Sequence, residues 1–327
     1  MGSAPTEFAE VIRFRFGGPV SASDGAVGRL TYVLSDPTAR VITHVAVRLS
    51  GFPPKTYNLP VELVQDAQAR GITLTMPLAE IARKAEPAPS GTVQISGATT
   101  VFSDSTRLGS LVQASAHRET GALWRLVVQR GFLSGEKLVP VDTAISVETR
   151  RLVVHLPADQ LKNLTGYRDD AALIQEARDA IFNYPRLRID LRGIQVLAAD
   201  GELWLCGHIS SDLNKRAAED QVRDIQGVAT VHNELVADTD LASDVANALA
   251  ADPRTQGQYI GVYPDLGVVT LRGAVNGTAA RDVATSTADA VPGVERVINE
   301  LAVRPDATVL PNLASVTSDV ERVPGGR

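Results

Sequence analysis

The sequence predicts an α+β multidomain protein, with two small β-barrels followed by two small α/β sandwich modules. Three observations lead to this prediction. A short phrase occurs twice, as GVATVHNEL at 227–235 and as GVERVINEL at 293–301, so that Gly227 corresponds to Gly293. A second repeat relates segment 23–84 to segment 103–164, in which Asp24 corresponds to Asp104. Strand-like runs dominate that N-terminal repeat, whereas helical periodicity alternates with strands in the C-terminal one.

The N-terminal repeat predicts two barrel domains, over residues 1–86 and 87–165. Asp24 matches Asp104, and Pro60 matches Pro140 at the same spacing. Each copy contains several short strand-like runs separated by turn signals. Closing such a sheet into a barrel removes its exposed strand edges. We therefore expect each copy to form a small closed barrel.

The first of these copies resembles the PRC-barrel family. The resemblance rests on DGAVGRL at 24–30, on Asp36-Pro37 and on the turn LPV at 59–61, and it covers about residues 10–165. In the second copy, Ser105 replaces Gly25, and HR at 117–118 replaces Asp36-Pro37. The resemblance implies adaptor domains rather than an enzyme, and it raises an RNA or ribosome adaptor as one candidate function.

The C-terminal repeat predicts two α/β modules, over residues 166–238 and 239–303. Apolar residues recur at helical spacing at Leu173, Ala177 and Ile181, and the pattern repeats after residue 240. A short strand, a second helix (213–225 and 279–290) and a final strand follow in each copy. Gly227 and Gly293 stand where a left-handed helix C-cap is expected. So small a module buries little apolar surface alone, and a second copy adds stability.

Asn233 and Asn299 are the unusual residues of the repeated phrase, because each is polar on an otherwise apolar strand face. We expect each side chain to hydrogen-bond the backbone of a neighbouring loop and to fix the shape of that loop. A contact with a ligand is the alternative.

The doubled modules resemble the BON domain, named for bacterial osmotic-stress and nodulation proteins. The match is Gly-x-Val/Leu-x-Leu-x-Gly, then a helix, then Gly-Val-x-x-Val-x-Asn-x-Leu, in two copies over about 168–303. The resemblance implies a non-enzymatic protein of bacterial envelopes, secretion rings or stress responses. It also implies binding to phospholipid surfaces or self-association.

Composition and charge limit the classes of function. The net charge is −6, which argues against a DNA partner and makes RNA an unfavoured one. Residues 1–165 carry 17 basic and 14 acidic side chains, whereas residues 166–327 carry 15 and 24, giving +3 and −9. Halves of opposite charge favour head-to-tail contact between copies. Two unrelated domain families with different surfaces would give the same asymmetry.

The sequence contains no recognisable catalytic or metal-binding motif. The five histidines lack metal-ligand spacing, and neither a GxSxG elbow, a P-loop nor a GxGxxG dinucleotide motif occurs. Cys206 lies in an apolar stretch and is expected to be a buried core residue. Asp169-Asp170 precedes an apolar helix and is expected to cap it. We therefore expect no enzyme activity, no catalytic residue, no cofactor and no metal.

These observations favour a non-catalytic scaffold that self-associates into a filament or another homo-oligomer. An envelope-associated stress protein that binds phospholipid through its BON-like modules is the first alternative. The N-terminus has neither a basic start nor an apolar stretch, and no run approaches the roughly 18 apolar residues of a membrane span. We therefore expect a cytoplasmic location, with envelope association as the alternative. The tail at 304–327 is expected to be extended or disordered, with Val309, Leu310 and Leu313 as an assembly arm.

Overall fold

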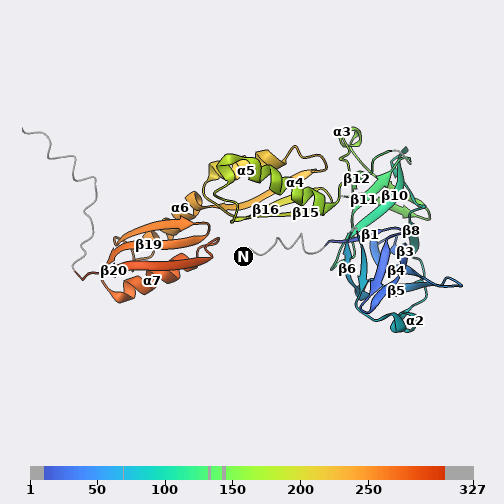
Figure 1. Ribbon diagram of the computed structural model, residues 1–327, viewed down its shortest axis with the longest axis horizontal. Coiled ribbons are helices and arrows are strands. Elements are labelled where there is room, and N and C mark those ends of the chain that lie inside the picture. The colour runs from blue at the N-terminus through green and yellow to red at the C-terminus, as the bar shows by residue number, and fades with distance from the viewer. Residues whose placement is uncertain (1–10, 69, 132–133, 142–144, 306–327) are drawn as a thin grey trace, which may run out of the picture.

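The computed structural model describes residues 11–305 except 69, 132–133 and 142–144, and the chain forms three parts arranged in a row (Figure 1). Two β-sheets at one end form the sheet pair, residues 11–162. The first α/β unit, residues 170–237, lies in the middle, and the second α/β unit, residues 238–303, lies at the far end. The predicted assembly arm, Val309, Leu310 and Leu313, lies outside the described residues.

The first sheet follows the order β5-β4-β3-β2-β7-β6, and β8 pairs with β3 as a seventh strand. All pairs are antiparallel except β2–β7. The strands are β2 (Pro19–Ala22), β3 (Gly25–Asp36), β4 (Val41–Leu49), β5 (Thr56–Pro60), β6 (Val64–Gln68), β7 (Gly71–Leu74) and β8 (Val93–Ser96). Short helical segments η1 (Val61–Leu63), η2 (Leu78–Glu80) and α2 (Ile81–Lys84) connect or follow them.

The second sheet repeats this topology, in the order β12-β11-β10-β9-β14-β13 with β1 paired to β10. Its one parallel pair, β14–β9, corresponds to β2–β7 of the first sheet. The strands are β1 (Val11–Arg15), β9 (Thr100–Ser103), β10 (Thr106–His117), β11 (Leu123–Gln129), β12 (Lys137–Pro140), β13 (Ile145–Glu148) and β14 (Arg151–Val154), and helix α3 (Ala158–Lys162) follows them. The N-terminal sequence repeat therefore corresponds to a repeated sheet.

The two sheets exchange one strand each. Strand β1 precedes the first sheet in the chain but pairs with β10 of the second, from Val11 opposite His117 to Arg15 opposite Gln113. Strand β8 follows the first sheet and leads toward the second, yet it pairs with β3. One hydrophobic core runs through both sheets and includes Phe14 from β1. The hydrogen bonding thus crosses the predicted division at residue 87.

The predicted closed barrels are not formed by the described strands. In the first sheet the strand order ends at β5 and β6, and these two strands do not pair with each other. They are consecutive in the chain, but the intervening turn of 3-10 helix η1 separates them. The sheets bury their apolar faces in the shared core and exchange strands, so each remains open. The resemblance to PRC-barrel domains stays a prediction.

Each α/β unit has the order helix–strand–strand–helix–strand, which is one strand more than the helix–strand–helix–strand order given by the sequence pattern. The first unit contains α4 (Asp170–Asn183), η3 (Pro185–Leu187), β15 (Ile194–Ala199), β16 (Glu202–Ile209), α5 (Asp212–Val222) and β17 (Thr230–Ala237). The second contains α6 (Asp238–Ala251), β18 (Tyr259–Asp265), β19 (Val268–Val275), α7 (Thr278–Asp289) and β20 (Arg296–Val303). In both sheets the central strand pairs antiparallel with the first strand and parallel with the last.

The repeated phrase is a turn followed by a strand. Gly227 and Gly293 have positive φ, 101° and 92°, but they are not the predicted helix C-caps, because α5 and α7 already end at the C-cap residues Arg223 and Ala290. The helices bury Leu173, Ala177 and Ile181 in the first unit against one face of its sheet. The opposite face of each sheet carries no described helix of its own unit.

Candidate functional site

Several buried polar side chains, among them Arg13, Asp200 and His208, lie at contacts between the parts of this chain. Among the residues that the structure describes, no group of three or more His, Cys, Asp or Glu side chains is placed to hold a metal ion. Cys206 is buried, as expected, and burial raises the pKa of its thiol to about 11, where it is a poor nucleophile at neutral pH. Within the described part of the chain, every helix is too short or too polar to cross a bilayer.

A cavity of about 640 Å³ lies between the two sheets. Its ionisable side chains are His44, Glu62, Glu86, Arg118 and Glu119. His44 Nε2 lies 3.5 Å from Glu86 Oε2, and Arg118 is turned toward backbone carbonyls of β6. No cysteine, serine or lysine is among the described residues that line the cavity. Thr43, which also lines the cavity, donates from Oγ1 to the Leu34 carbonyl at 3.3 Å, and this oxygen lies 3.0 Å from His44 Nδ1.

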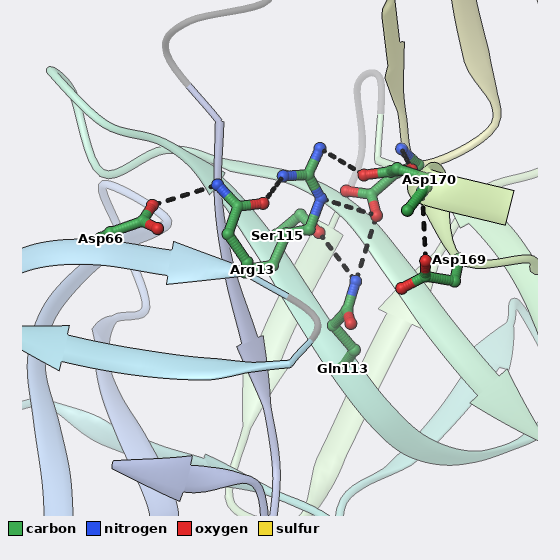
Figure 2. A network of polar contacts seen from close by, with 9 residues as sticks. Arg13, Asp66, Gln113, Ser115, Asp169 and Asp170 are labelled. Atoms are coloured by element: carbon green, nitrogen blue, oxygen red, sulfur yellow. Dashed lines mark hydrogen bonds and ion pairs between the residues drawn. The ribbon is translucent and has the colours of Figure 1, made fainter. Parts of the chain in front are cut away.

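A buried polar network joins the sheet pair to the first α/β unit (Figure 2). Arg13, on β1, is only 4% exposed and donates from Nε to Asp200 Oδ1 at 3.2 Å. Its Nη2 atom lies 3.0 Å from Asp170 Oδ2, and its Nη1 atom donates to Gln68 Oε1 at 2.7 Å. Gln113, on β10, donates to the same Asp200 oxygen at 3.1 Å. Strands from one part and acidic side chains from the other thus meet in a closed contact.

Local structure of the first unit positions the two carboxylates. Asp169 caps α4 by accepting from Ala171 N at 3.1 Å, which confirms the predicted cap. Asp170 instead turns toward the β15–β16 hairpin and accepts from Asp200 N at 2.8 Å. Asp200 has a positive φ of 44°, a conformation that Asp tolerates in tight turns. The hairpin turn therefore holds Asp200 against Arg13.

Two carboxylates, those of Asp170 and Asp200, share the guanidinium of Arg13 in this network. Burial raises the pKa of Asp170 to about 7, with Arg13 opposing the rise and the charge of Asp200 adding to it. Burial alone would lower the pKa of Arg13, but Asp200 and Asp170 outweigh it and raise that pKa. Asp200 is fully buried, and its Oδ2 atom has no hydrogen-bond partner among the described residues. The network is therefore costly to expose or to break.

A cluster of aromatic side chains lies beside the network and completes this junction. Trp204 is 1% exposed, and its ring stacks on His232 with centroids 4.8 Å apart. Trp124, from β11, packs against the same cluster. Glu202 pairs with Arg125 of β11 and with His232, the latter at 3.0 Å. Both tryptophans therefore anchor packing where two parts of the chain meet.

The second α/β unit docks on the first through the equivalent end. Asp238, the counterpart of Asp170, accepts from Leu266 N at 2.8 Å and from Gly267 N at 3.2 Å in the β18–β19 turn. His208, at the end of β16, donates from Nε2 to the Gly293 carbonyl at 2.7 Å. Strand β17 ends at Ala237 and α6 begins at Asp238, so no linker separates the units.

The two predicted polar residues do not meet, and they serve equivalent structural roles. Asn233 Nδ2 donates to the Lys215 carbonyl at 2.9 Å, and Asn299 Nδ2 donates to the Arg281 carbonyl at 2.9 Å. Both carbonyls belong to the helix packed on the strand, so each asparagine ties a strand to helix backbone rather than to loop backbone. Helix α7 is additionally held by Thr285, whose hydroxyl accepts from Asn299 at 2.6 Å.

Sequence reasoning missed Arg13, Gln113, Asp200 and His208, the residues that join the parts. Asp200-Gly201 was the available signal, because an Asp-Gly pair between two apolar runs is typical of a hairpin turn. Nothing in the local pattern indicates that this turn docks on another part of the chain.

Comparisons with known proteins agree with the α/β units. The model of the BON domain family matches residues 169–237 and 237–305. Osmotically-inducible protein Y of Escherichia coli (strain K12) is 27% identical over 157 residues, covering 44% of this chain and 77% of that protein.

Two solved structures of CdsD, described as a structural protein of the type III secretion system of Chlamydia trachomatis, are also similar. For the C-terminal domain the identity is 16% and the TM-score 0.34, covering 42% of this chain and 66% of that one, just under two thirds. For the second structure the values are 14% and 0.22, with 47% and 100% covered. The chain, by the family match, carries two BON domains in tandem over residues 169–305, as the resemblance implied.

Proposed function

We propose that this chain is a non-catalytic scaffold that self-associates through its repeated domains into a filament or another homo-oligomer. The observation that carries the proposal is the reuse of one end for docking. Each α/β unit contacts the part before it through its hairpin turn, with Gly201 beside Leu138 and Gly267 beside His208. A domain that docks on its neighbour twice within one chain suits docking between chains as well, through a surface that these internal contacts leave uncovered.

The joints between parts support a scaffold because they favour a chain that moves as one body. The first joint is a buried ion network, and the second has no linker residues. Mobile domains connected by flexible linkers lose more entropy when they assemble, which weakens association. A preformed rod of four small sheets loses less.

Size-exclusion chromatography with light scattering and negative-stain electron microscopy test the proposal. We expect a mass above that of one chain, rising with protein concentration, and particles longer than a single rod. Contacts that do not close would give filaments, whereas a closed contact gives a fixed oligomer. Monomers alone at every protein and salt concentration would refute self-association.

A second candidate is a stress protein that binds the envelope through phospholipid. The family match and the similarity to an osmotically inducible protein favour it. The net charge of −9 on residues 166–327 opposes it, because anionic lipid repels an acidic surface. Co-sedimentation with phosphatidylglycerol vesicles and with neutral phosphatidylcholine vesicles separates the two candidates. Binding to either vesicle by a protein that stays monomeric would favour the lipid candidate.

A further inference from the structure

The helix-free faces of the two BON domains differ in what covers them. In the first α/β unit, Trp204 and His208 lie on this face and are 1% and 6% exposed. Trp124 of the sheet pair packs on Trp204, and the turn of the second unit, at Gly267, packs on His208. This face is therefore built to be covered.

The same face of the second unit is open among the described residues. Tyr259, Tyr263 and Ile298 point from it and are 64%, 53% and 38% exposed. Their neighbours on the other side of the strands, such as Val269 and Leu271, fill the core under the helices. We call Tyr259, Tyr263, Arg272, Ile298 and Glu300 the open face.

The open face consists of alternating rows across the three strands. Tyr263, Thr270 and Ile298 occupy one row, and Gly261, Arg272 and Glu300 occupy the next. A Cβ atom on Gly261 would lie 2.8 Å from the Tyr263 ring, so this ring lies flat over the glycine. The open face therefore has one row with a ring and an aliphatic side chain, beside a row that carries two charges.

Two open faces are complementary in charge, because each carries one positive and one negative side chain, Arg272 and Glu300. Arg272 Nε lies 2.8 Å from Glu300 Oε2, and its guanidinium lies 5.4 Å from the centroid of the Tyr263 ring. Both side chains are at least half exposed, so each retains donors or acceptors for another partner. A second copy turned by a two-fold rotation presents Glu300 where the first presents Arg272.

We propose that the open face packs on the open face of a second copy of this chain, as a two-fold dimer. The proposal rests on the proposed function and deepens it, because it names the surface through which copies meet. Packed sheets lie about 10 Å apart, which the rows of Tyr263 and Ile298 can fill from both sides. Arg272 of each copy then pairs with Glu300 of the other. This contact closes, so by itself it gives a dimer rather than a filament.

Charge reversal in two separate chains tests this pairing. Arg272→Glu leaves two acidic side chains on the open face, and Glu300→Arg leaves two basic ones. Each variant alone is expected to dimerise on the order of tenfold more weakly or worse, because like charges face each other. An equimolar mixture restores opposite charges across the interface, so we expect mixed dimers at close to wild-type affinity. Sedimentation velocity with one variant fluorescently labelled measures all three samples.

Arg216→Glu is the matched control. Arg216 is an exposed arginine on α5 that pairs with Asp212 at 2.8 Å, and its reversal is expected to leave dimerisation unchanged. Ile298→Lys tests the apolar row. We expect it to abolish the dimer on its own, and also when it is combined with each charge reversal in the equimolar mixture. Circular dichroism checks that each variant remains folded.

The outcomes separate this inference from the proposed function. A wild-type protein that stays monomeric refutes both. Wild-type association that neither Arg272→Glu nor Ile298→Lys weakens would overturn the inference while self-association stands. Single variants that dissociate without rescue in the mixture would also overturn the two-fold pairing. If deleting 306–327 is needed before any dimer forms, that segment occupies the open face and the inference fails.

Discussion

Replacing Arg13 by methionine should detach the first α/β unit from the sheet pair at neutral pH. The substitution keeps apolar volume but removes the guanidinium that serves the buried carboxylate of Asp200, the partly buried carboxylate of Asp170 and one amide. Removing one partner of a buried ion pair leaves the other charge uncompensated, at a cost of about 3–5 kcal/mol. Asp200 is fully buried and cannot regain water without opening the junction. The free energy of unfolding at this junction should fall by that amount.

The two tryptophans of the chain report this junction directly. Trp124 and Trp204 belong to the same cluster beside the network, and the sequence contains no other tryptophan. Urea titration followed by tryptophan emission therefore measures the local transition, which matters because a multidomain chain has no single unfolding free energy. Exposure of Trp204 should shift the emission to the red at lower urea in Arg13→Met.

A surface arginine provides the comparison for this prediction. Arg216→Met removes an exposed ion pair and should change the same transition by no more than about 1 kcal/mol. Adding Asp200→Asn to Arg13→Met should recover part of the loss, because the orphaned charge disappears. An Arg13→Met transition indistinguishable from that of Arg216→Met would refute the argument that the network holds the junction.

Three further predictions concern the network and the repeated domains. The pKa of Asp170 is raised from 3.8 to about 7, so between these two pH values the folded state keeps a proton that the unfolded state has released. The free energy of unfolding should therefore fall as pH rises through this range, and Asp170→Asn should flatten that part of a plot of urea midpoint against pH. Asn299→Ala should cost about 1–2 kcal/mol by removing the hydrogen bonds to α7, seen as faster amide exchange in that helix, and Asn233→Ala should do the same in α5. Gly267→Ala should disrupt the joint between the two units, because φ of Gly267 is 84° and the new Cβ would lie 2.6 Å from His208 Nε2. The loss of thermal stability should be smaller when His208→Ala is also present.

The sequence repeats predicted the helices and strands within each unit better than the contacts between units. The C-terminal repeat located both BON domains, because helix periodicity, the glycine turn at Gly227 and the following strand are local signals. The N-terminal repeat likewise corresponds to two sheets of equal topology. The strand exchange of β1 and β8 could not be inferred, because a strand has the same alternation whichever sheet it joins.

The junction residues escaped sequence reasoning for a related physical reason. Arg13 stands in the run VIRFR, where an arginine between apolar residues suggests the exposed side of a strand. It is buried only because Asp170 and Asp200 arrive from a distant part of the chain. The predicted closure of the barrels is wrong: β5 and β6 end the first sheet without pairing with each other, and local strand patterns do not show which strands of a sheet will pair.

Sedimentation velocity of the full-length chain over a wide range of protein concentration tests the central claim most directly. A scaffold that works through its surfaces should show a sedimentation coefficient that rises with concentration from a slow, elongated monomer to a dimer or larger species. One concentration-independent boundary with the mass of a single chain, from nanomolar to high micromolar protein and at both low and high salt, would contradict it.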